Sequence, residues 1–279
     1  MNIAVSHVRR VLSACYDPQE ASALAKIVCC EMLGQSPTDF YMGKDITLGK
    51  EKHQELEDIL RRLCNFEPIQ YIQGVARFGG RDFRVTPAVL VPRPETEELT
   101  ALVAAEAPAG ARILDIGTGS GCIAVTLSIE VKEACVEGWD ISSEALEVAR
   151  LNARRLKAQV HFEQRDIFAP ESEATASRYD IVVSNPPYVT EAEKADMERN
   201  VLDWEPANAL FVPDDAPLHY YRRIATLGHK LLTGNGRLYL EINRAYGPHV
   251  CHLLQEEGYG ETVLRKDFFG NDRFVIAKI

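Results

Sequence analysis

The sequence predicts an α/β fold in which a mostly parallel sheet with an antiparallel C-terminal edge follows a small helical domain. Three patterns indicate this fold. Residues 1–66 place apolar side chains at helical spacing, residues 67–94 hold two short extended runs around a Gly-Gly pair, and residues 95–279 alternate apolar strands with helices. Such alternation is typical of a parallel sheet covered on both faces. We therefore expect a helical domain, a linking β-hairpin and a larger α/β domain with these boundaries.

Length and composition indicate how many domains the chain can form and where the protein is located. The chain has 279 residues, 46% of them apolar, which is enough for one large domain and a smaller one. It contains no uninterrupted apolar run of about 18 residues, and its first residues lack the long apolar segment of a signal peptide. We therefore expect a cytoplasmic protein that does not enter a membrane.

Charge and cysteine usage bear on partners and metals. The chain has 31 basic and 41 acidic residues, a net charge of −10, which counts against direct binding of duplex nucleic acid. Its seven cysteines are odd in number and include no Cys-x-x-Cys pair. This spacing predicts reduced thiols, with neither a disulfide framework nor a metal site.

The helical domain is predicted from two amphipathic segments. Residues 18–34 predict one helix, which Pro18 begins and Gly34 ends. Residues 50–66 predict a second helix with one apolar stripe among charged residues, and the Pro-, Gly- and Asp-containing stretch 35–49 predicts a loop between them.

The larger domain is predicted from strands and helices that alternate along the chain. Strands are expected at 111–117, 134–140, 159–166, 179–187 and 236–243, helices at 96–107, 120–131, 142–156, 218–232 and 247–258, and a closing antiparallel pair at 261–267 and 272–279. Ser142 or Ser143 is a plausible cap for the third of these helices.

A glycine turn follows the first of these strands. The stretch "LDIGTGSGCIAV", residues 114–125, contains Gly117, Gly119 and Gly121, which permit a tight turn and let a ligand approach the backbone closely. The spacing G-x-G-x-G departs from the dinucleotide fingerprint G-x-G-x-x-G. The turn nevertheless predicts a cofactor site, because it joins a buried strand to a helix.

Acidic residues around this turn favour S-adenosylmethionine (SAM) over a dinucleotide. Asp140 ends the second strand, 23 positions after Gly117, where an acid suits the ribose hydroxyls of either cofactor. Asp115 precedes the first glycine, and a carboxylate there suits an ammonium or sulfonium rather than a pyrophosphate. Asp166 follows the third strand, where it could meet an adenine amino group or serve only as a cap.

The stretch "SNPPYV", residues 184–189, ends the fourth strand. Neither proline has a backbone N–H, so the strand stops at a stiff corner rich in hydrogen-bond acceptors, at the sheet edge where parallel α/β sheets bind ligands. A planar primary amide is a poor nucleophile, and acceptors on both of its N–H bonds would aim its nitrogen at a methyl group. The Asn185 side-chain oxygen and the Pro186 carbonyl could be those acceptors, with Tyr188 as a flat wall. The alternative is an ordinary strand-ending turn.

Together these motifs resemble the class I SAM-dependent methyltransferases, which have a Rossmann-like sheet. More narrowly, the chain resembles the release-factor glutamine methyltransferases, the HemK/PrmC family. The resemblance spans residues 67–275 and is carried by "EPIQYIQGVARFGGRDFRV", "LVPRPETEEL", "LDIGTGSGCIAV", "SNPPYV", "EPANALF" and "KDFFGNDRFV". "NPPY" is shared with DNA adenine and rRNA guanine methyltransferases, whereas "PRPETEEL" is much more specific.

The resemblance implies methylation of the glutamine N5 in the GGQ motif of peptide-chain release factors, with S-adenosylhomocysteine as the other product and the helical domain as the part that binds substrate. It implies that SAM is held by Asp115, Gly117, Thr118, Ser120, Gly119, Gly121, Asp140, Ile141, Asp166, Ile167 and Asn185. It implies that the glutamine amide is held by Asn185, Pro186, Pro187 and Tyr188. Arg93 and Glu95 would lie near the cofactor or form a structural ion pair. Relatives often have Gly after "EI" and Gln shortly beyond, while this chain reads "EINRAYG", which puts any contact by residues 241–247 in doubt.

Two other functions remain open from the sequence. A methyltransferase acting on an exocyclic amino group of DNA or rRNA would use the same corner, but it should carry a basic recognition segment, which we do not find. A non-catalytic SAM-binding module would not need the corner.

Overall fold

The computed structural model of the protein describes residues 2–3, 5–170 and 178–279. These residues form two compact units. A helical unit comprises Met1–Gly74 with Glu198–Trp204, and an α/β unit comprises Val75–Met197 with Glu205–Ile279. The helical unit thus extends beyond residue 66 and takes in a short segment from the second half of the chain.

The helical unit is built around a core of its own, from Val5 to Ile69. Its helices are α1 (Val5–Leu12), α2 (Pro18–Lys26), a π-helical turn (Ile27–Met32), α3 (Pro37–Tyr41), α4 (Lys50–Cys64), α5 (Ile69–Gln73) and, in the later segment, α9 (Arg199–Leu202). Strands β1 (Asn2–Ile3) and β2 (Ile46–Thr47) pair antiparallel.

The sequence prediction for the helical unit is correct in part, and helix capping explains where it holds and where it does not. Asp17 caps α2 through its carboxylate and Pro18 is the first helical residue, while Gly34 has a φ of +78° after the helix ends. The predicted loop 35–49 was wrong in part, because it contains α3 and β2. Ser36 caps α3 just before Pro37, and a helix of one turn is too short to show a periodic pattern.

The linking segment 67–94 begins in α5 and continues as a β-hairpin. Strands β3 (Val75–Phe78) and β4 (Arg81–Arg84) pair antiparallel, as predicted. The turn consists of Gly79 and Gly80, whose φ angles are +55° and +70°. Two successive residues with positive φ form the type of tight hairpin turn that favours glycine.

The α/β unit contains a seven-stranded sheet in the order β12-β13-β11-β8-β5-β6-β7. The strands are β5 (Arg112–Ile116), β6 (Cys135–Asp140), β7 (Val160–Gln164), β8 (Tyr179–Ser184), β11 (Leu232–Glu241), β12 (Thr262–Lys266) and β13 (Asp272–Lys278). Only β13 runs antiparallel to its neighbours β11 and β12. The predicted fold class, a mostly parallel sheet with an antiparallel C-terminal edge, is therefore confirmed.

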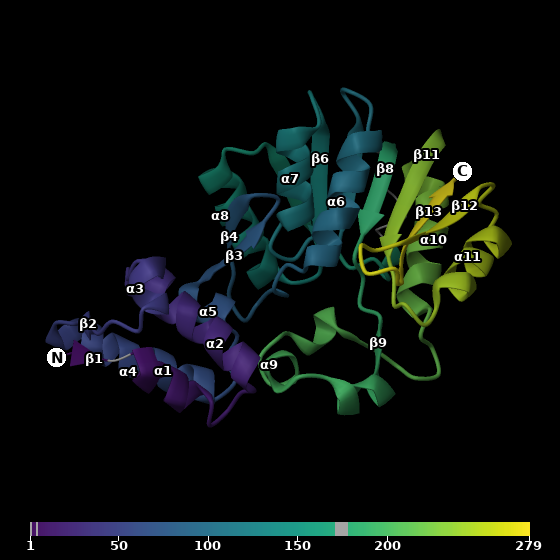
Figure 1. The fold of residues 1–279 in the computed structure, drawn as a ribbon. Coiled ribbons are helices and arrows are strands. Elements are labelled where there is room, and N and C mark those ends of the chain that lie inside the picture. Colours follow the sequence, from purple (N-terminus) through teal and green to yellow (C-terminus); the bar gives the residue numbers. More distant parts are fainter. Residues whose placement is uncertain (1, 4, 171–177) are drawn as a thin grey trace. The chain divides into compact units, whose positions relative to one another are not determined.

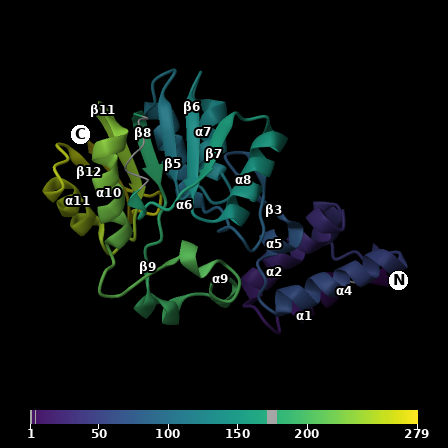
Figure 2. The ribbon, with the colours of Figure 1, turned by 180° about the vertical axis from the view of Figure 1, so that it is seen from behind.

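Helices cover both faces of this sheet (Figures 1 and 2). Helices α6 (Pro94–Glu106), α7 (Cys122–Glu130) and α8 (Ser143–Leu156) share one apolar core, and α10 (His219–Leu231) and α11 (Gly247–Glu256) share the other. Successive strand residues alternate between the two cores, as Ile113 and Leu114 do in β5. Ser142 caps α8 by accepting from the Ala145 N–H at 3.1 Å.

A long connection joins β8 to α10. Its strands β9 (Val189–Thr190) and β10 (Phe211–Val212) pair in parallel, and its 3₁₀ helices span Glu191–Asp196 and Ala207–Ala209. None of these elements was predicted, because elements of two to six residues are too short to show a periodic pattern. Within the described part of the chain, no helix is both long and apolar enough to cross a bilayer.

Candidate active site

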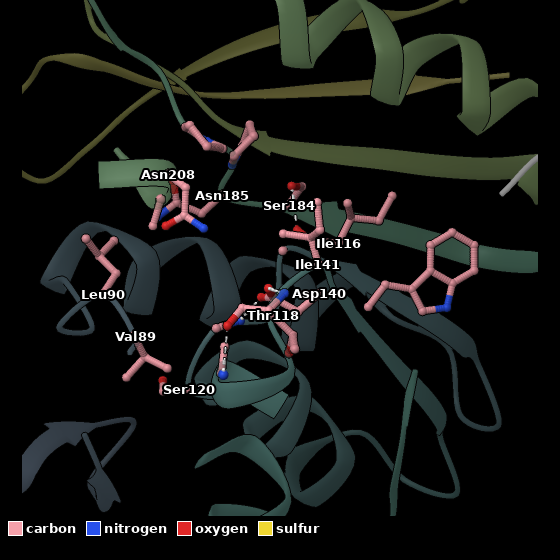
Figure 3. Close-up of a pocket in the computed structure, with 18 of the residues that line it drawn as sticks. Val89, Leu90, Ile116, Thr118, Ser120, Asp140, Ile141, Ser184, Asn185 and Asn208 are labelled. Atoms are coloured by element: carbon pink, nitrogen blue, oxygen red, sulfur yellow. Dashed lines mark hydrogen bonds between the residues drawn. The ribbon is translucent and has the colours of Figure 1, made fainter. Parts of the chain in front are cut away.

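A cavity opens at the carboxyl ends of β5, β6 and β8, within the α/β unit (Figure 3). Its empty volume is about 1120 Å³, solvent at its mouth included, which is the size class of pockets that hold small organic ligands. Most of the predicted site residues line it: Gly117, Thr118, Gly119, Ser120, Asp140, Ile141, Asp166, Ile167, Asn185, Pro186 and Pro187. Asp115, Gly121 and Tyr188 do not.

The glycine turn faces the cavity with open backbone. Gly117 and Gly119 have φ angles of +74° and +54°, and a Cβ added to either would meet no atom within 4 Å. Gly121 serves packing instead, since a Cβ there would lie 3.1 Å from the Ala149 methyl. The first two glycines therefore leave room above the turn for a ligand.

Asp140 is tied to this turn. Its carboxylate accepts from the Gly119 N–H at 2.8 Å and from the Ser142 N–H at 2.9 Å. Desolvation by burial raises the pKa of Asp140, and the two backbone N–H groups oppose that effect. The side chain is held in the cavity wall in one position, where it can accept further hydrogen bonds.

Asp115 lies behind the turn rather than in the cavity wall. It is 0% exposed and accepts from Thr118 Oγ1 at 2.6 Å and the Ala124 N–H at 3.3 Å, both through Oδ2. Its Oδ1 atom is buried and has no hydrogen-bond partner among the described residues. Burial raises the pKa of Asp115 to about 7. One acceptor next to the glycine turn is thus left unsatisfied by the residues that the structure describes.

The part of the cavity wall next to Asp140 combines apolar surface with a carboxylate. Ile141 is 56% exposed although it is apolar, and Ile167 and Phe168 lie along the same wall. Asp166 accepts from the Phe168 N–H at 2.8 Å, which fixes the turn after β7. An exposed isoleucine beside an aspartate fits a flat, partly polar ring.

The corner at Asn185 is held from within the protein. Asn185 Nδ2 donates to Thr96 Oγ1 at 3.0 Å, and Thr96 Oγ1 donates to Glu241 Oε2 at 2.7 Å. Within the described residues, neither the Asn185 side-chain oxygen nor the Pro186 carbonyl accepts a hydrogen bond. Both of these acceptors belong to residues that line the cavity, and Figure 3 shows Asn185 across from Thr118 and Asp140.

Tyr188 differs from its predicted place. Its ring packs against the core under α10 and α11, and its hydroxyl donates to Glu241 Oε1 at 3.1 Å. Burial raises the pKa of Tyr188 well above its ordinary value. The tyrosine thus anchors the corner to β11 and lies outside the cavity wall; its expected contact with substrate stays a prediction.

The departure in "EINRAYG" has a structural role. Asn243 is 5% exposed, and its Nδ2 donates to the Tyr188 carbonyl at 3.2 Å and to Glu193 at 3.0 Å. Its backbone N–H donates to Tyr221 at 3.2 Å. Asn243 therefore fastens the chain that leaves the corner.

Several lining residues were missed by the sequence analysis. Arg93, which the sequence did single out, lines the cavity and pairs with Glu205, not with Glu95, at 2.5 Å; Glu205 also accepts from the Val91 N–H at 3.2 Å. This ion pair joins "VPRPE" to "EPANA". The missed wall residues come from these same two stretches and from residues on either side of the first: Ala88, Val89, Leu90, Pro92, Thr96, Pro206, Asn208 and Ala209. Both stretches were quoted as motifs, but neither has a periodic or charged pattern that marks individual residues.

Comparison with known proteins agrees with this geometry. The family model described as "Methyltransferase small domain" matches residues 96–204, and the one described as "PrmC N-terminal domain" matches residues 4–74. A release factor glutamine methyltransferase of Bacteroides thetaiotaomicron is 53% identical over 277 residues, 99% of both chains. The enzyme of that name in Flavobacterium psychrophilum is 37% identical, covering 95% of this chain and 94% of its own.

A solved structure shows the same fold. A methyltransferase from Pyrococcus furiosus superposes with a TM-score of 0.53 at 15% identity, covering 82% of this chain and 98% of its own. The full-length similarity to curated relatives is the stronger finding. The chain belongs to the release factor glutamine methyltransferase family.

Proposed function

We propose that this protein transfers a methyl group from SAM to the side-chain N5 of the glutamine in the GGQ motif of peptide-chain release factors, in the cytoplasm where translation terminates. The observation that carries the proposal is the pair of acceptors at the corner. The Asn185 side-chain oxygen and the Pro186 carbonyl belong to lining residues and bond to no described donor. A primary amide has two N–H bonds to offer them.

The cavity fits SAM. The open glycine turn leaves room for its amino-acid part, and the unsatisfied Oδ1 of Asp115 lies beside that turn, where it favours the cationic ammonium group. Asp140 would accept from the ribose hydroxyls. Ile141 and the Asp166–Ile167 turn would hold the adenine. When bound, SAM supplies an electrophilic methyl group on a sulfonium.

The residues of the corner orient the glutamine amide. Two acceptors on its N–H bonds fix the plane of the amide, turn the nitrogen towards the cofactor side of the cavity and stabilise the positive charge that develops there. The two prolines keep the corner stiff, because each fixes its own φ near −65°. Asn185 and Pro186 therefore act as catalytic residues by hydrogen bonding, and the scheme requires no metal ion.

The helical unit is proposed to bind the release factor. The residues that line the cavity all belong to the α/β unit, so the helical unit is free for a role in recognition. The curated relatives are named for release factor glutamine, and one family model is an N-terminal domain that matches residues 4–74. Removing residues 1–74 should weaken release-factor binding while SAM binds within about threefold of the full chain, as measured by calorimetry on the folded product.

A direct assay tests the function. The full chain is incubated with labelled SAM and, in separate reactions, with a release factor, duplex DNA and rRNA, each with and without EDTA. We expect label only in the release factor, on the GGQ glutamine by mass spectrometry, and no effect of EDTA. Label in DNA or rRNA, with none in the release factor, would contradict the proposal.

A further inference from the structure

Glu241 is a buried carboxylate at the end of β11. It is 1% exposed, and it accepts from Thr96 Oγ1 at 2.7 Å and from the Tyr188 hydroxyl at 3.1 Å. The cation near it, Arg273, makes its ion pair with Asp267 at 3.3 Å. Glu241 has no ion-pair partner among the described residues; a buried carboxylate in this situation is unfavourable for stability, and a neutral group of the same shape would be tolerated better. We therefore expect Glu241 to have a role other than stabilising the fold.

The hydrogen bonds that Glu241 accepts indicate what this role is. Above its pKa of about 7 the Glu241 carboxyl is ionised and can only accept, so the Thr96 hydroxyl gives its single proton to Glu241. Towards Asn185, Thr96 can then only accept. Asn185 must turn its NH₂ group to Thr96, as the 3.0 Å bond records, and its carbonyl oxygen to the other side.

We propose that Glu241 is a positioning residue that acts through Thr96 to fix which end of the Asn185 amide faces the substrate. This inference rests on the proposed function, in which that oxygen receives an N–H of the glutamine. Without the relay, nothing at Thr96 would distinguish the oxygen of Asn185 from its nitrogen, because a hydroxyl can donate or accept.

Replacing Glu241 with Gln should reverse the relay. The buried Tyr188 hydroxyl keeps its acceptor only if it donates to the amide oxygen of the new side chain, which leaves the new NH₂ group facing Thr96. Thr96 then accepts from that NH₂ group, and its proton, no longer given to a carboxylate, is available to the oxygen of Asn185. The NH₂ group of Asn185 would face the cavity, where it repels the N–H of the substrate.

Kinetics of methyl transfer to the release factor at pH 8, where Glu241 is ionised, test this reversal. We expect Glu241→Gln to lower kcat by about 10², the loss found when one oriented partner of a reacting group is removed, with SAM affinity within twofold of wild type. Thr96→Val frees the Asn185 amide without reversing it, so its loss should be smaller, about tenfold. The double variant should resemble Thr96→Val rather than show the product of both losses. Valine has no hydroxyl, so the substitution at Glu241 can no longer change the orientation of the Asn185 amide.

Glu106→Gln is the matched control. Glu106 lies on the same helix as Thr96 and accepts from the hydroxyl of Tyr239, a residue of β11, at 2.8 Å, but it does not line the cavity. This variant removes a tyrosine-bound carboxylate between the same two elements and should keep wild-type kcat.

Nuclear magnetic resonance supplies a readout that is independent of activity. With ¹⁵N-labelled asparagine and Asn185→Ala for assignment, the Asn185 NH₂ protons should show contacts to the Thr96 side chain in the wild type and lose them in Glu241→Gln. If Glu241→Gln loses those contacts while the wild-type enzyme itself leaves release factor unmethylated, the relay is supported and the proposed function is contradicted.

Three results would overturn the relay: retained contacts with full kcat in Glu241→Gln, a double variant that shows the product of both losses, or unchanged kcat in Thr96→Val. The last applies even if Glu241→Gln fails to fold.

Discussion

Glu241 also makes a prediction about stability. Burial, the largest cause, raises its pKa from 4.5 to about 7, while Thr96, Tyr188 and the charge of Arg273 lower it and Glu95 raises it further. Because the folded-state pKa is raised, the stabilising contribution is fully present below pH 4.5 and is lost as the pH rises through about 7. The wild type should therefore lose stability across this window, relative to a variant that cannot ionise at this position.

The size of the effect follows from the two pKa values. A displacement from 4.5 to about 7 corresponds to roughly 3 kcal/mol of unfolding free energy at 1.36 kcal/mol per pKa unit. Most of it, about 2–3 kcal/mol, falls between pH 5 and 8. Glu241→Gln should become more stable relative to wild type by this amount over that interval. Asp115, whose pKa is also raised to about 7, contributes equally to both proteins and cancels.

Urea unfolding at pH 5, 6, 7 and 8 measures the difference. Trp139 is fully buried in the sheet of the α/β unit, whereas Trp204 belongs to the helical unit. A Trp204→Phe background in both proteins therefore leaves a single fluorescent reporter of the α/β unit. Unfolding free energies that stay parallel from pH 5 to pH 8 would refute the assignment of a raised pKa to Glu241.

Three further changes probe the cofactor and corner contacts. Asp140→Ala should weaken SAM binding by about 1.5–3 kcal/mol through loss of a charged acceptor; equal affinity by calorimetry in a folded variant would remove Asp140 from the site. Gly119→Ala places a methyl group in the open space above the turn and should weaken SAM binding, whereas Gly110→Ala, at a φ of +76° with the same open surroundings, should cost similar backbone strain of about 1–2 kcal/mol and leave SAM affinity unchanged; equal SAM affinities in the two variants would contradict the role of the turn. Asn243→Ala removes donors to Tyr188 and Glu193 and should lower kcat severalfold with little change in SAM affinity, measured as initial rates; unchanged kcat would mean that the corner does not depend on this contact.

The parts of the site that the sequence predicted are those written in one continuous stretch. The glycine turn, Asp140 and the Asn185 corner each follow a strand directly, and the ends of neighbouring parallel strands meet at one edge of the sheet. The order of the motifs along the chain was therefore enough to predict that they lie together. The large domain was predicted because its strands and helices are long enough to show periodicity.

The parts that were missed depend on contacts between distant segments. Thr96 meets Glu241 across 145 residues and Asn185 across 89, and nothing local to Thr96 indicates either partner. Tyr188 was expected in the cavity wall because it follows the prolines, but the buried carboxylate of Glu241 draws its hydroxyl inward. The short strands β9 and β10 exist only through their pairing with each other, which no local pattern records.

The central claim is that the corner at Asn185 orients the substrate amide, and Asn185→Ala tests it most directly. Mass spectrometry follows methylation of the GGQ glutamine of a release factor, while calorimetry measures SAM binding and circular dichroism the folded fraction. We predict that the folded variant binds SAM but loses roughly 10²–10³ in kcat, as when a comparable oriented hydrogen-bonding group is removed. Full methylation by folded Asn185→Ala would contradict the account and leave the corner as a turn that only ends β8.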